Sequence, residues 1–183
     1  MRCQTENVLD FILRPSVEAD VPAITAIYAH WVQTSPATFE IDPPDADEMA
    51  RRRADILARN LPYLVVESKH DVAGYAYATP YRPRAAYRFS VEDSVYLHPD
   101  YVRQGLGRRL LTAVVARCED LGYRQMVAVI GGRDNLASIS LHQACGFTQA
   151  GILRSVGFKF GRWEDTVLMQ RSLGAADSTL PQS

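Results

Sequence analysis

Two closely spaced glycines are the first feature of this sequence that could bind a ligand, through their backbone. Gly105 and Gly107 occur in the run Val102-Arg103-Gln104-Gly105-Leu106-Gly107, immediately before a segment whose apolar residues recur at helical spacing. Glycine lets the backbone approach a ligand closely and leaves its N–H groups pointing outward, and a helix N-terminus favours a phosphate. The turn therefore predicts a site for a phosphate-bearing cofactor. A purely structural turn is the alternative that two glycines alone leave open.

The segments around this turn must position it, and their patterns predict alternating helices and strands. Apolar residues at helical spacing predict helices from 21 to just before 35, and over 47–59, 106–121 and 135–145. Alternating or continuous apolar runs predict strands at 8–13, 63–67, 72–78, 88–97, 126–130, 147–157 and 163–171. This order indicates one α/β or α+β domain with a central mixed sheet and helices on both faces.

The strand predicted at 88–97 leads to the glycine turn and carries a carboxylate. Its alternation gives two faces, with Phe89, Val91, Val95 and Leu97 on one and Ser90, Glu92, Ser94 and Tyr96 on the other. The valines on either side of Glu92 favour a central strand. The alternative is that Glu92 is an ordinary surface carboxylate, as most glutamates are.

Length and composition narrow the class of protein. A chain of 183 residues suits one domain, which we place at 8–173, with a flexible N-terminus at 1–7 and a flexible tail at 174–183. The net charge of −1 argues against broad binding to nucleic acid or to an anionic membrane. Cys3, Cys118 and Cys145 lack metal-ligand spacing, and the N-terminus lacks a secretory apolar run. We therefore expect a cytoplasmic protein without a metal.

The glycine run resembles the coenzyme-binding pattern of the GNAT superfamily of acyl-coenzyme A N-acyltransferases, Gln/Arg-x-x-Gly-x-Gly/Ala. Val102 departs from it at the first position. The segment from Asn135 through Gly146-Phe147 resembles the superfamily's coenzyme-arm helix, and the likeness covers about 9–171. It implies a mostly antiparallel GNAT sheet and acetyl-coenzyme A as co-substrate. The coenzyme-binding residues that it implies are Val95, Tyr96, Leu97, Arg103, Gln104, Gly105, Leu106, Gly107, Arg108, Asn135, Ser138 and His142.

Five further segments resemble the phosphinothricin acetyltransferase branch, which includes enzymes acting on methionine sulfoximine and methionine sulfone. They are Thr38-Phe39-Glu40, Arg84-Ala85-Ala86-Tyr87, the run 91–96, Leu141-His142 and the run 156–163. The likeness implies an enzyme that acetylates the α-amine of a small amino-acid analogue, and a homodimer. The substrate-binding residues would be Phe39, Arg82, Arg84, Tyr87 and Glu92. A peptide or protein N-terminal acetyltransferase and a non-catalytic acyl-coenzyme A sensor are the alternatives.

The resemblance also implies catalytic roles. An α-amine with a pKa of about 8 is mostly protonated at neutral pH, so a proton acceptor helps it to attack a thioester. Glu92 matches the family's catalytic glutamate. His142 takes the place of the tyrosine that protonates the departing thiolate in many GNAT enzymes, although a histidine bonded only to the coenzyme or to its own helix is an equal alternative.

Cys145 and the segment that contains Lys159 and Trp163 can each be interpreted in two ways. Cys145 stands among apolar neighbours before Gly146, so a packed thiol is favoured over an acetyl carrier and direct transfer between the two substrates is expected. Lys159 and Trp163 belong to a branch-like segment that either lines the site or packs in a dimer.

Overall fold

The computed structural model describes residues 11–68 and 71–180. Its seven strands form one sheet in the order β1-β2-β3-β4-β5-β7-β6, in which only β4 and β5 are parallel. The predicted mixed, mostly antiparallel sheet is confirmed. The strands are β1 Phe11–Pro15, β2 Tyr63–Ser68, β3 Asp71–Pro80, β4 Ser90–Leu97, β5 Gln125–Gly131, β6 Thr148–Lys159 and β7 Arg162–Ser172.

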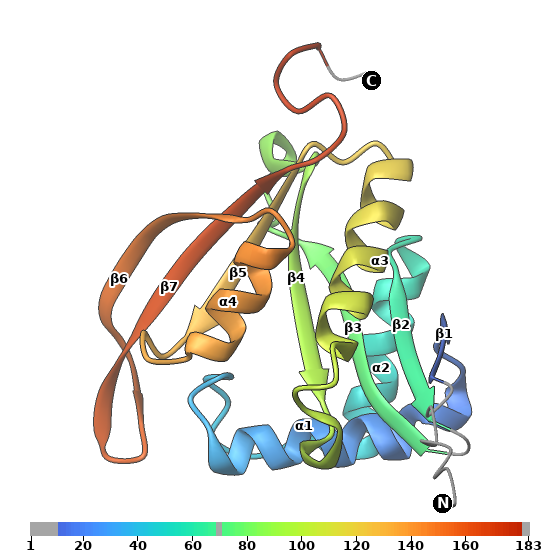
Figure 1. Ribbon diagram of the computed structural model, residues 1–183, viewed down its shortest axis with the longest axis vertical. Helices are drawn as coiled ribbons and strands as arrows, with labels where there is room; N and C mark the ends of the chain where they lie inside the picture. Colours follow the sequence, from blue (N-terminus) through green and yellow to red (C-terminus); the bar gives the residue numbers. More distant parts are fainter. Residues whose placement is uncertain (1–10, 69–70, 181–183) are drawn as a thin grey trace, which may run out of the picture.

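Four α-helices in the described residues accompany the sheet, and all four fall where the apolar spacing predicted them. They are α1 Val21–Thr34, α2 Ala46–Ala58, α3 Leu106–Asp120 and α4 Leu136–Ala144. In Figure 1, α3 and α4 lie in front of the strands and α2 lies behind them. The Asp45 side chain caps α2 by accepting from the Glu48 N–H. No helix within the described residues is long and apolar enough to cross a membrane.

The ends of the chain bear on the predicted domain bounds. The N-terminal segment 1–7, and the first part of the strand predicted at 8–13, lie outside the described residues. The rest of that strand forms β1, which pairs with β2 at one edge of the sheet. In the described part of the tail, Ala176 and Thr179 accept hydrogen bonds from the Arg124 guanidinium. The flexible tail stays a prediction.

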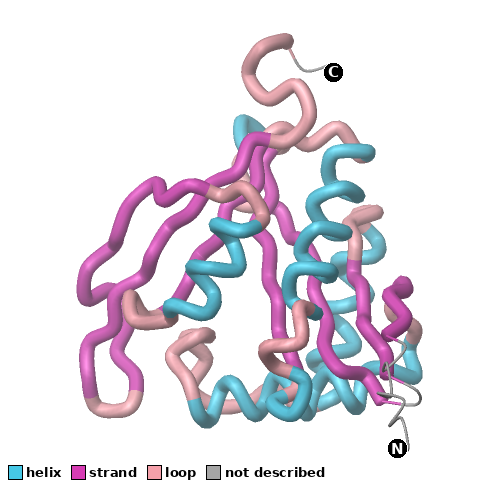
Figure 2. Tube along the Cα trace, in the orientation of Figure 1, coloured by secondary structure: helices cyan, strands magenta, loops and turns pink. Residues whose placement is uncertain are grey.

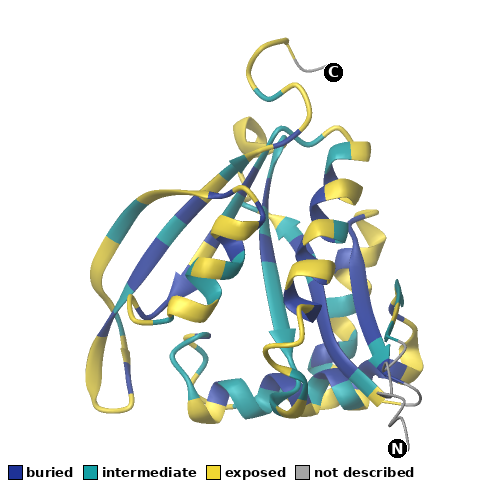
Figure 3. Ribbon diagram, viewed as in Figure 1, coloured by how far each residue is buried: buried dark blue, intermediate teal, exposed yellow. Residues whose placement is uncertain are grey.

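The two faces of β3 and β4 differ in side-chain size. Ala76 and Ala78 face the α3 side, where small side chains let that helix pack closely on the sheet. On the opposite face Tyr75 lies against Tyr96, with ring centres 5.4 Å apart, and Tyr28 of α1 meets the Tyr96 ring edge-on at 5.0 Å. The dark blue of β2 and β3 in Figure 3 shows that this part of the sheet is the buried core.

The sheet opens between β4 and β5. These strands pair only where Ser90–Glu92 meets Gln125–Val127. Beyond Glu92, β4 keeps its partner β3 on one side only, while β5 continues along β7. Figure 2 shows the two strands diverging from their paired ends. The divergence leaves backbone groups of one side of β4 without a strand partner, which makes them available to a ligand.

The loop that follows α1 lies directly on the end of β5. A Cβ atom at Gly131 would stand 2.0 Å from the carbonyl oxygen of Pro36, and one at Gly132 would stand 3.1 Å from the Pro36 ring. No side chain fits between these two backbones. The loop can therefore reach the opening of the sheet only because β5 ends in glycine.

Replacing Gly131 with alanine tests this close approach. We expect Gly131→Ala to lower the free energy of unfolding by about 1–3 kcal/mol, because the new methyl group must displace the Pro36 backbone. Gly151→Ala, in β6, is the matched control: its Cβ would meet nothing within 4 Å, so a change of less than about 0.5 kcal/mol is expected. Urea unfolding of both variants gives the comparison, and equal effects would contradict the close contact.

Candidate functional site

A cleft of about 650 Å³ occupies the opening between β4 and β5. Its walls come from the unpaired half of β4, the facing half of β5, the start of α3, one face of α4 and the end of α1. The cleft brings together most of the predicted coenzyme-binding residues: Val95, Tyr96, Leu97, Arg103, Gly105, Gly107, Arg108, Asn135, Ser138 and His142. Segments far apart in the sequence thus form one site.

The glycine turn begins α3 at one wall of this cleft. Gly105 is the N-cap residue with φ +76°, and the Arg109 N–H donates to the Gly105 carbonyl at 3.2 Å. The N–H groups before Arg109 belong to the first turn, where a helix supplies no acceptor. Arg103 is also left-handed, with φ 63°, and its side chain lines the cleft together with Arg108. This end of α3 can hold an anion on backbone donors and two guanidinium groups.

The two glycines do different things. A Cβ atom at Gly105 would meet nothing within 4 Å, so the left-handed backbone is what requires glycine there. A Cβ atom at Gly107 would stand 3.1 Å from the Leu141 side chain, so this glycine lets α3 and α4 approach. Both glycines therefore have a structural role, and the ligand-binding role of the turn stays a prediction.

Two predicted coenzyme residues do not line the cleft. The Gln104 side chain donates to the Asp100 carbonyl at 3.3 Å and is exposed. The Leu106 side chain packs in the core and is 1% exposed. Only the backbone of these residues can take part in the turn. Val102, where the sequence departs from the family pattern, does line the cleft.

Asn135 begins α4 at the other wall. Its side-chain oxygen accepts from the Ser138 N–H at 3.3 Å, and its side-chain nitrogen lies 3.4 Å from the Gly131 carbonyl. The side chain thus caps the helix and ties it to the end of β5. This capping role positions the α4 face that carries His142.

His142 forms a buried pair with Asp93, a residue that sequence analysis did not single out. Nδ1 lies 2.7 Å from the Ser138 carbonyl, which can only accept, so Nδ1 carries a proton. Nε2 lies 3.0 Å from Oδ2 of Asp93, and the two side chains are 5% and 1% exposed. Burial alone disfavours the charged imidazole, but the bond to Asp93 outweighs it and raises the pKa of His142 above its ordinary value.

One signal in the sequence could have revealed Asp93. It stands between Val91 and Val95 on the apolar face of an alternating strand, where a carboxylate is out of place. Its second oxygen, Oδ1, is buried and has no hydrogen-bond partner among the described residues. A carboxylate held in this way needs the proton of His142 to offset its burial.

Glu92 points to the opposite face of β4 from Asp93, because successive side chains of a strand alternate. It pairs with Thr79 of β3 and Val127 of β5, at the last position where β4 and β5 are joined. Burial, together with the nearby charge of Asp93, raises the pKa of the Glu92 carboxyl above its ordinary value, and Arg82 opposes this shift. A carboxylate with a raised pKa is a better proton acceptor at neutral pH.

None of the five predicted substrate residues, Glu92 included, is among the residues that line the cleft. Arg82, Arg84 and Tyr87 are exposed on the segment between β3 and β4. The Arg82 guanidinium lies 4.8 Å from the centre of the Tyr81 ring, and Tyr81 meets Tyr87 edge-on. Of these three residues, only Arg82 contributes to the pKa of the Glu92 carboxyl, which its positive charge lowers. Phe39, 37% exposed, lies on the loop after α1.

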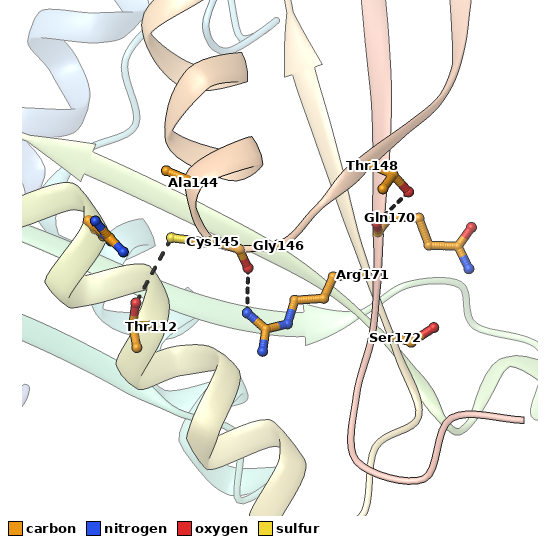
Figure 4. Close-up of a pocket in the computed structure, with 9 residues that line it drawn as sticks. Thr112, Ala144, Cys145, Gly146, Thr148, Gln170, Arg171 and Ser172 are labelled. Atoms are coloured by element: carbon orange, nitrogen blue, oxygen red, sulfur yellow. Dashed lines mark hydrogen bonds between the residues drawn. The ribbon is translucent and has the colours of Figure 1, made fainter. Parts of the chain in front are cut away.

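A second concavity, of about 700 Å³, adjoins the cleft and shares Arg108 and Ala144 with it. Figure 4 shows the Arg171 guanidinium directed at the Cys145 carbonyl and Thr112 beside the Cys145 sulfur. The Cys145 side chain is buried, and its Sγ lies 3.9 Å from Thr112 Oγ1. Its thiol is packed, as the sequence favoured. Among the residues that line this concavity there is no acid–base pair like that of Asp93 and His142.

Metal chemistry has no evident site in the described ranges 11–68 and 71–180. No group of three or more histidine, cysteine, aspartate or glutamate side chains in them lies close enough together to hold a metal ion.

Known proteins are similar to this chain in sequence and in fold. The model of the acetyltransferase (GNAT) family matches residues 24–147. The chain is 61% identical to the phosphinothricin N-acetyltransferase of Alcaligenes faecalis, over 89% of this chain and 83% of that protein. It is 40% identical to the L-methionine sulfoximine/L-methionine sulfone acetyltransferase of Salmonella typhimurium, over 88% and 94%.

A solved structure agrees closely with the fold. The crystal structure of a phosphinothricin acetyltransferase from Sinorhizobium meliloti, in complex with acetyl-coenzyme A, matches with a TM-score of 0.92 and 46% sequence identity. The match covers 94% of each chain.

The pair of Asp93 and His142 gives a prediction with a defined sign. In Asp93→Asn the imidazole is buried without its charge partner, so the pKa of His142, followed by NMR of its ring protons, should fall. A raised folded-state pKa stabilises the fold below the unfolded pKa of about 6.5. The stability lost in Asp93→Asn should therefore be largest at low pH and should shrink as pH rises through the folded pKa of His142.

Asp120→Asn serves as the control, since Asp120 is exposed at the end of α3. It should leave the pKa of His142 unchanged. An unaltered pKa of His142 in Asp93→Asn would contradict the pairing.

Proposed function

This chain belongs to the acetyltransferase (GNAT) family, as the sequence predicted, and we propose that it moves acetyl from acetyl-coenzyme A to the α-amine of a small amino-acid analogue such as phosphinothricin or methionine sulfoximine. One observation carries the proposal: the sheet opens immediately after Glu92. A carboxylate on one face of the sheet therefore stands beside a cleft whose wall on the other face includes the glycine turn of α3.

The residues of the cleft fit acetyl-coenzyme A. The left-handed Gly105 and the first turn of α3 offer N–H groups to a diphosphate, and Arg103 and Arg108 add charge. Acetyl-coenzyme A, when bound, supplies an acetyl group activated as a thioester. Backbone groups of β4 after Glu92 that face β5 have no strand partner and can hold the carbonyl of that group.

Glu92 is the proposed base. An α-amine must lose a proton before it attacks, and the raised pKa of Glu92 brings that carboxylate closer to the pKa of the amine. Its position on the face opposite the α3 turn lets the amine approach from one side of the sheet while the coenzyme lies on the other. Transfer is then direct, with no acetyl group carried on the protein.

His142 is the proposed proton donor to the departing thiolate. It carries a proton on Nδ1, bonded to Ser138, and shares a second with Asp93 through Nε2. Because it lines the cleft, it keeps that second proton close to where a thiolate would form.

The proposed acceptor site lies on the Glu92 side of the opening. Arg82 and Arg84 can meet the carboxylate or phosphinate of the substrate through paired hydrogen bonds, and Phe39 and Tyr87 offer aromatic surfaces. The three residues on the segment after β3 are exposed and, within the described structure, make no ion pair. They are therefore available to a charged ligand.

The decisive assay measures thiol release from acetyl-coenzyme A with purified protein. Saturable turnover is expected with phosphinothricin, methionine sulfoximine and methionine sulfone, and little with ordinary amino acids or a short peptide. Turnover confined to the peptide would instead favour an N-terminal acetyltransferase. Coenzyme binding with no turnover of any amine would favour the sensor.

Glu92→Gln is the matched variant in this assay. Loss of the base should lower kcat by about 10²–10⁴-fold and leave the affinity for acetyl-coenzyme A nearly unchanged, because the turn on α3 is untouched. The acid limb of the wild-type pH profile should follow the raised pKa of Glu92, with kcat/KM falling as pH falls. Full turnover of Glu92→Gln at neutral pH would remove Glu92 from this role.

Self-association is the second part of the proposal. The far end of the hairpin formed by β6 and β7 is mostly exposed, as its yellow colour in Figure 3 shows, and it carries large apolar side chains. Phe158 is 57% exposed, Phe160 54% and Trp163 65%. A surface of this kind favours an interface between copies of the chain.

Light scattering of the intact protein tests this, with the mass of a homodimer as the expected result. Trp163→Ser should shift the population toward monomer, since Trp163 contributes the most exposed ring of the three. Arg154→Ser, an exposed change on the same hairpin, is the control. A monomeric wild type would rule out the homodimer.

A further inference from the structure

Lys159 is the last residue of β6 and is only 4% exposed. Its ammonium donates to the Ser35 carbonyl at 2.9 Å and to the Thr38 carbonyl at 2.8 Å. Lysine is seldom buried unless its charge is matched by partners, and here both partners belong to one short loop. The lysine therefore joins the β6–β7 hairpin to the segment that follows α1.

The surroundings of the ammonium show that this contact is specific. Beyond the two carbonyls, Nζ lies 4.9 Å from the centre of the Phe160 ring, a distance suited to a cation–π contact. Burial lowers the pKa of Lys159, while the charge of Glu40 opposes that effect. Of the ion pairs in the described structure, none includes Lys159. The ammonium therefore binds backbone carbonyls of the loop and no carboxylate in the described structure.

The loop that Lys159 holds carries Phe39. A Cβ atom at Gly157 would stand 2.3 Å from Cε2 of Phe39, and one at Gly131 would stand 3.1 Å from Cε1. The ring therefore rests on bare backbone of β6 on one side and of β5 on the other. The position of the ring depends on the distance between the loop and the hairpin. The two hydrogen bonds of Lys159 fix that distance.

The same loop is fixed from its other side. The Tyr28 hydroxyl lies 2.9 Å from Thr38 Oγ1 and donates to Glu40 at 3.0 Å, while Arg52 donates to Glu40 at 2.6 Å. The start of the loop reaches the cleft, because Ser35 and Ala37 line it. A segment held between α1, α2 and the hairpin thus runs from the coenzyme cleft to the proposed acceptor site.

We propose that Lys159 is a positioning residue for the acceptor amine: through its two bonds to the loop it places Phe39 against the substrate. The inference rests on the proposed function, since Phe39 acts there in acceptor binding. Lys159 itself does not touch the reacting atoms. Its loss should therefore affect acceptor binding far more than coenzyme binding or the proton transfers at Glu92.

Steady-state kinetics of Lys159→Met tests the proposal, since methionine keeps the unbranched apolar stem of lysine and removes the ammonium group. We expect KM for the amine to rise about tenfold, a size consistent with losing charged hydrogen bonds. The dissociation constant for acetyl-coenzyme A should change less than about twofold. Arg154→Met removes a cation from an exposed position on the same strand and should leave both constants unchanged.

A double-mutant cycle separates positioning from a general loss of structure. In a Phe39→Ala background, Lys159→Met should add little to KM, because the residue acts through the missing ring. If Lys159→Met does not fold, Lys159→Gln, which retains an N–H donor, takes its place in the same cycle. Additive effects on KM in this cycle would overturn the inference.

The assay also keeps the two proposals distinct. Turnover of the amino-acid analogues by the wild-type protein establishes the proposed function without reference to Lys159. Given that turnover, an unchanged KM for the amine in folded Lys159→Met would overturn the positioning role alone.

Discussion

The chemistry available to this protein depends on the point at which β4 and β5 stop pairing. Three residue pairs join the strands, and the last is Glu92 with Val127. A sheet fully paired to its end would offer neither a cleft nor free backbone donors. The divergence is maintained from both sides, because β7 holds β5 along its length and Trp31 of α1 donates to the Leu97 carbonyl at 2.8 Å, at the end of β4.

The pleat of β4 then places two carboxylates on opposite faces of the sheet at the opening. Adjacent carboxylates at Glu92 and Asp93 face opposite sides of the sheet, one toward the proposed acceptor and the other toward α4. The charge of Asp93 adds to the effect of burial in raising the pKa of Glu92. His142 offsets the charge of Asp93 within the low-dielectric interior. Asp93 therefore links Glu92, the proposed base, and His142, the proposed proton donor, although they occupy different faces of the sheet.

Glycines give the site its shape by allowing close approach of backbones. Gly107 brings α3 to α4, Gly131 brings the loop after α1 to β5, and Gly157 brings Phe39 to β6. None of these three glycines is left-handed, whereas Gly105, at the start of α3, is.

The sequence alone predicted the helices, the strands and the glycine turn, because hydrophobic periodicity and the conformational freedom of glycine are local properties. The family followed from the resemblance of its motifs, which the family match confirms. It also identified Glu92 and His142 as chemically capable residues. Only the tertiary structure decided that His142 meets Asp93, 49 positions away, and that Lys159 holds the loop at Ser35, 124 positions away. Such contacts follow from how the sheet and helices pack in three dimensions, and no local pattern of residues encodes which distant carbonyl or carboxylate a buried cation will reach.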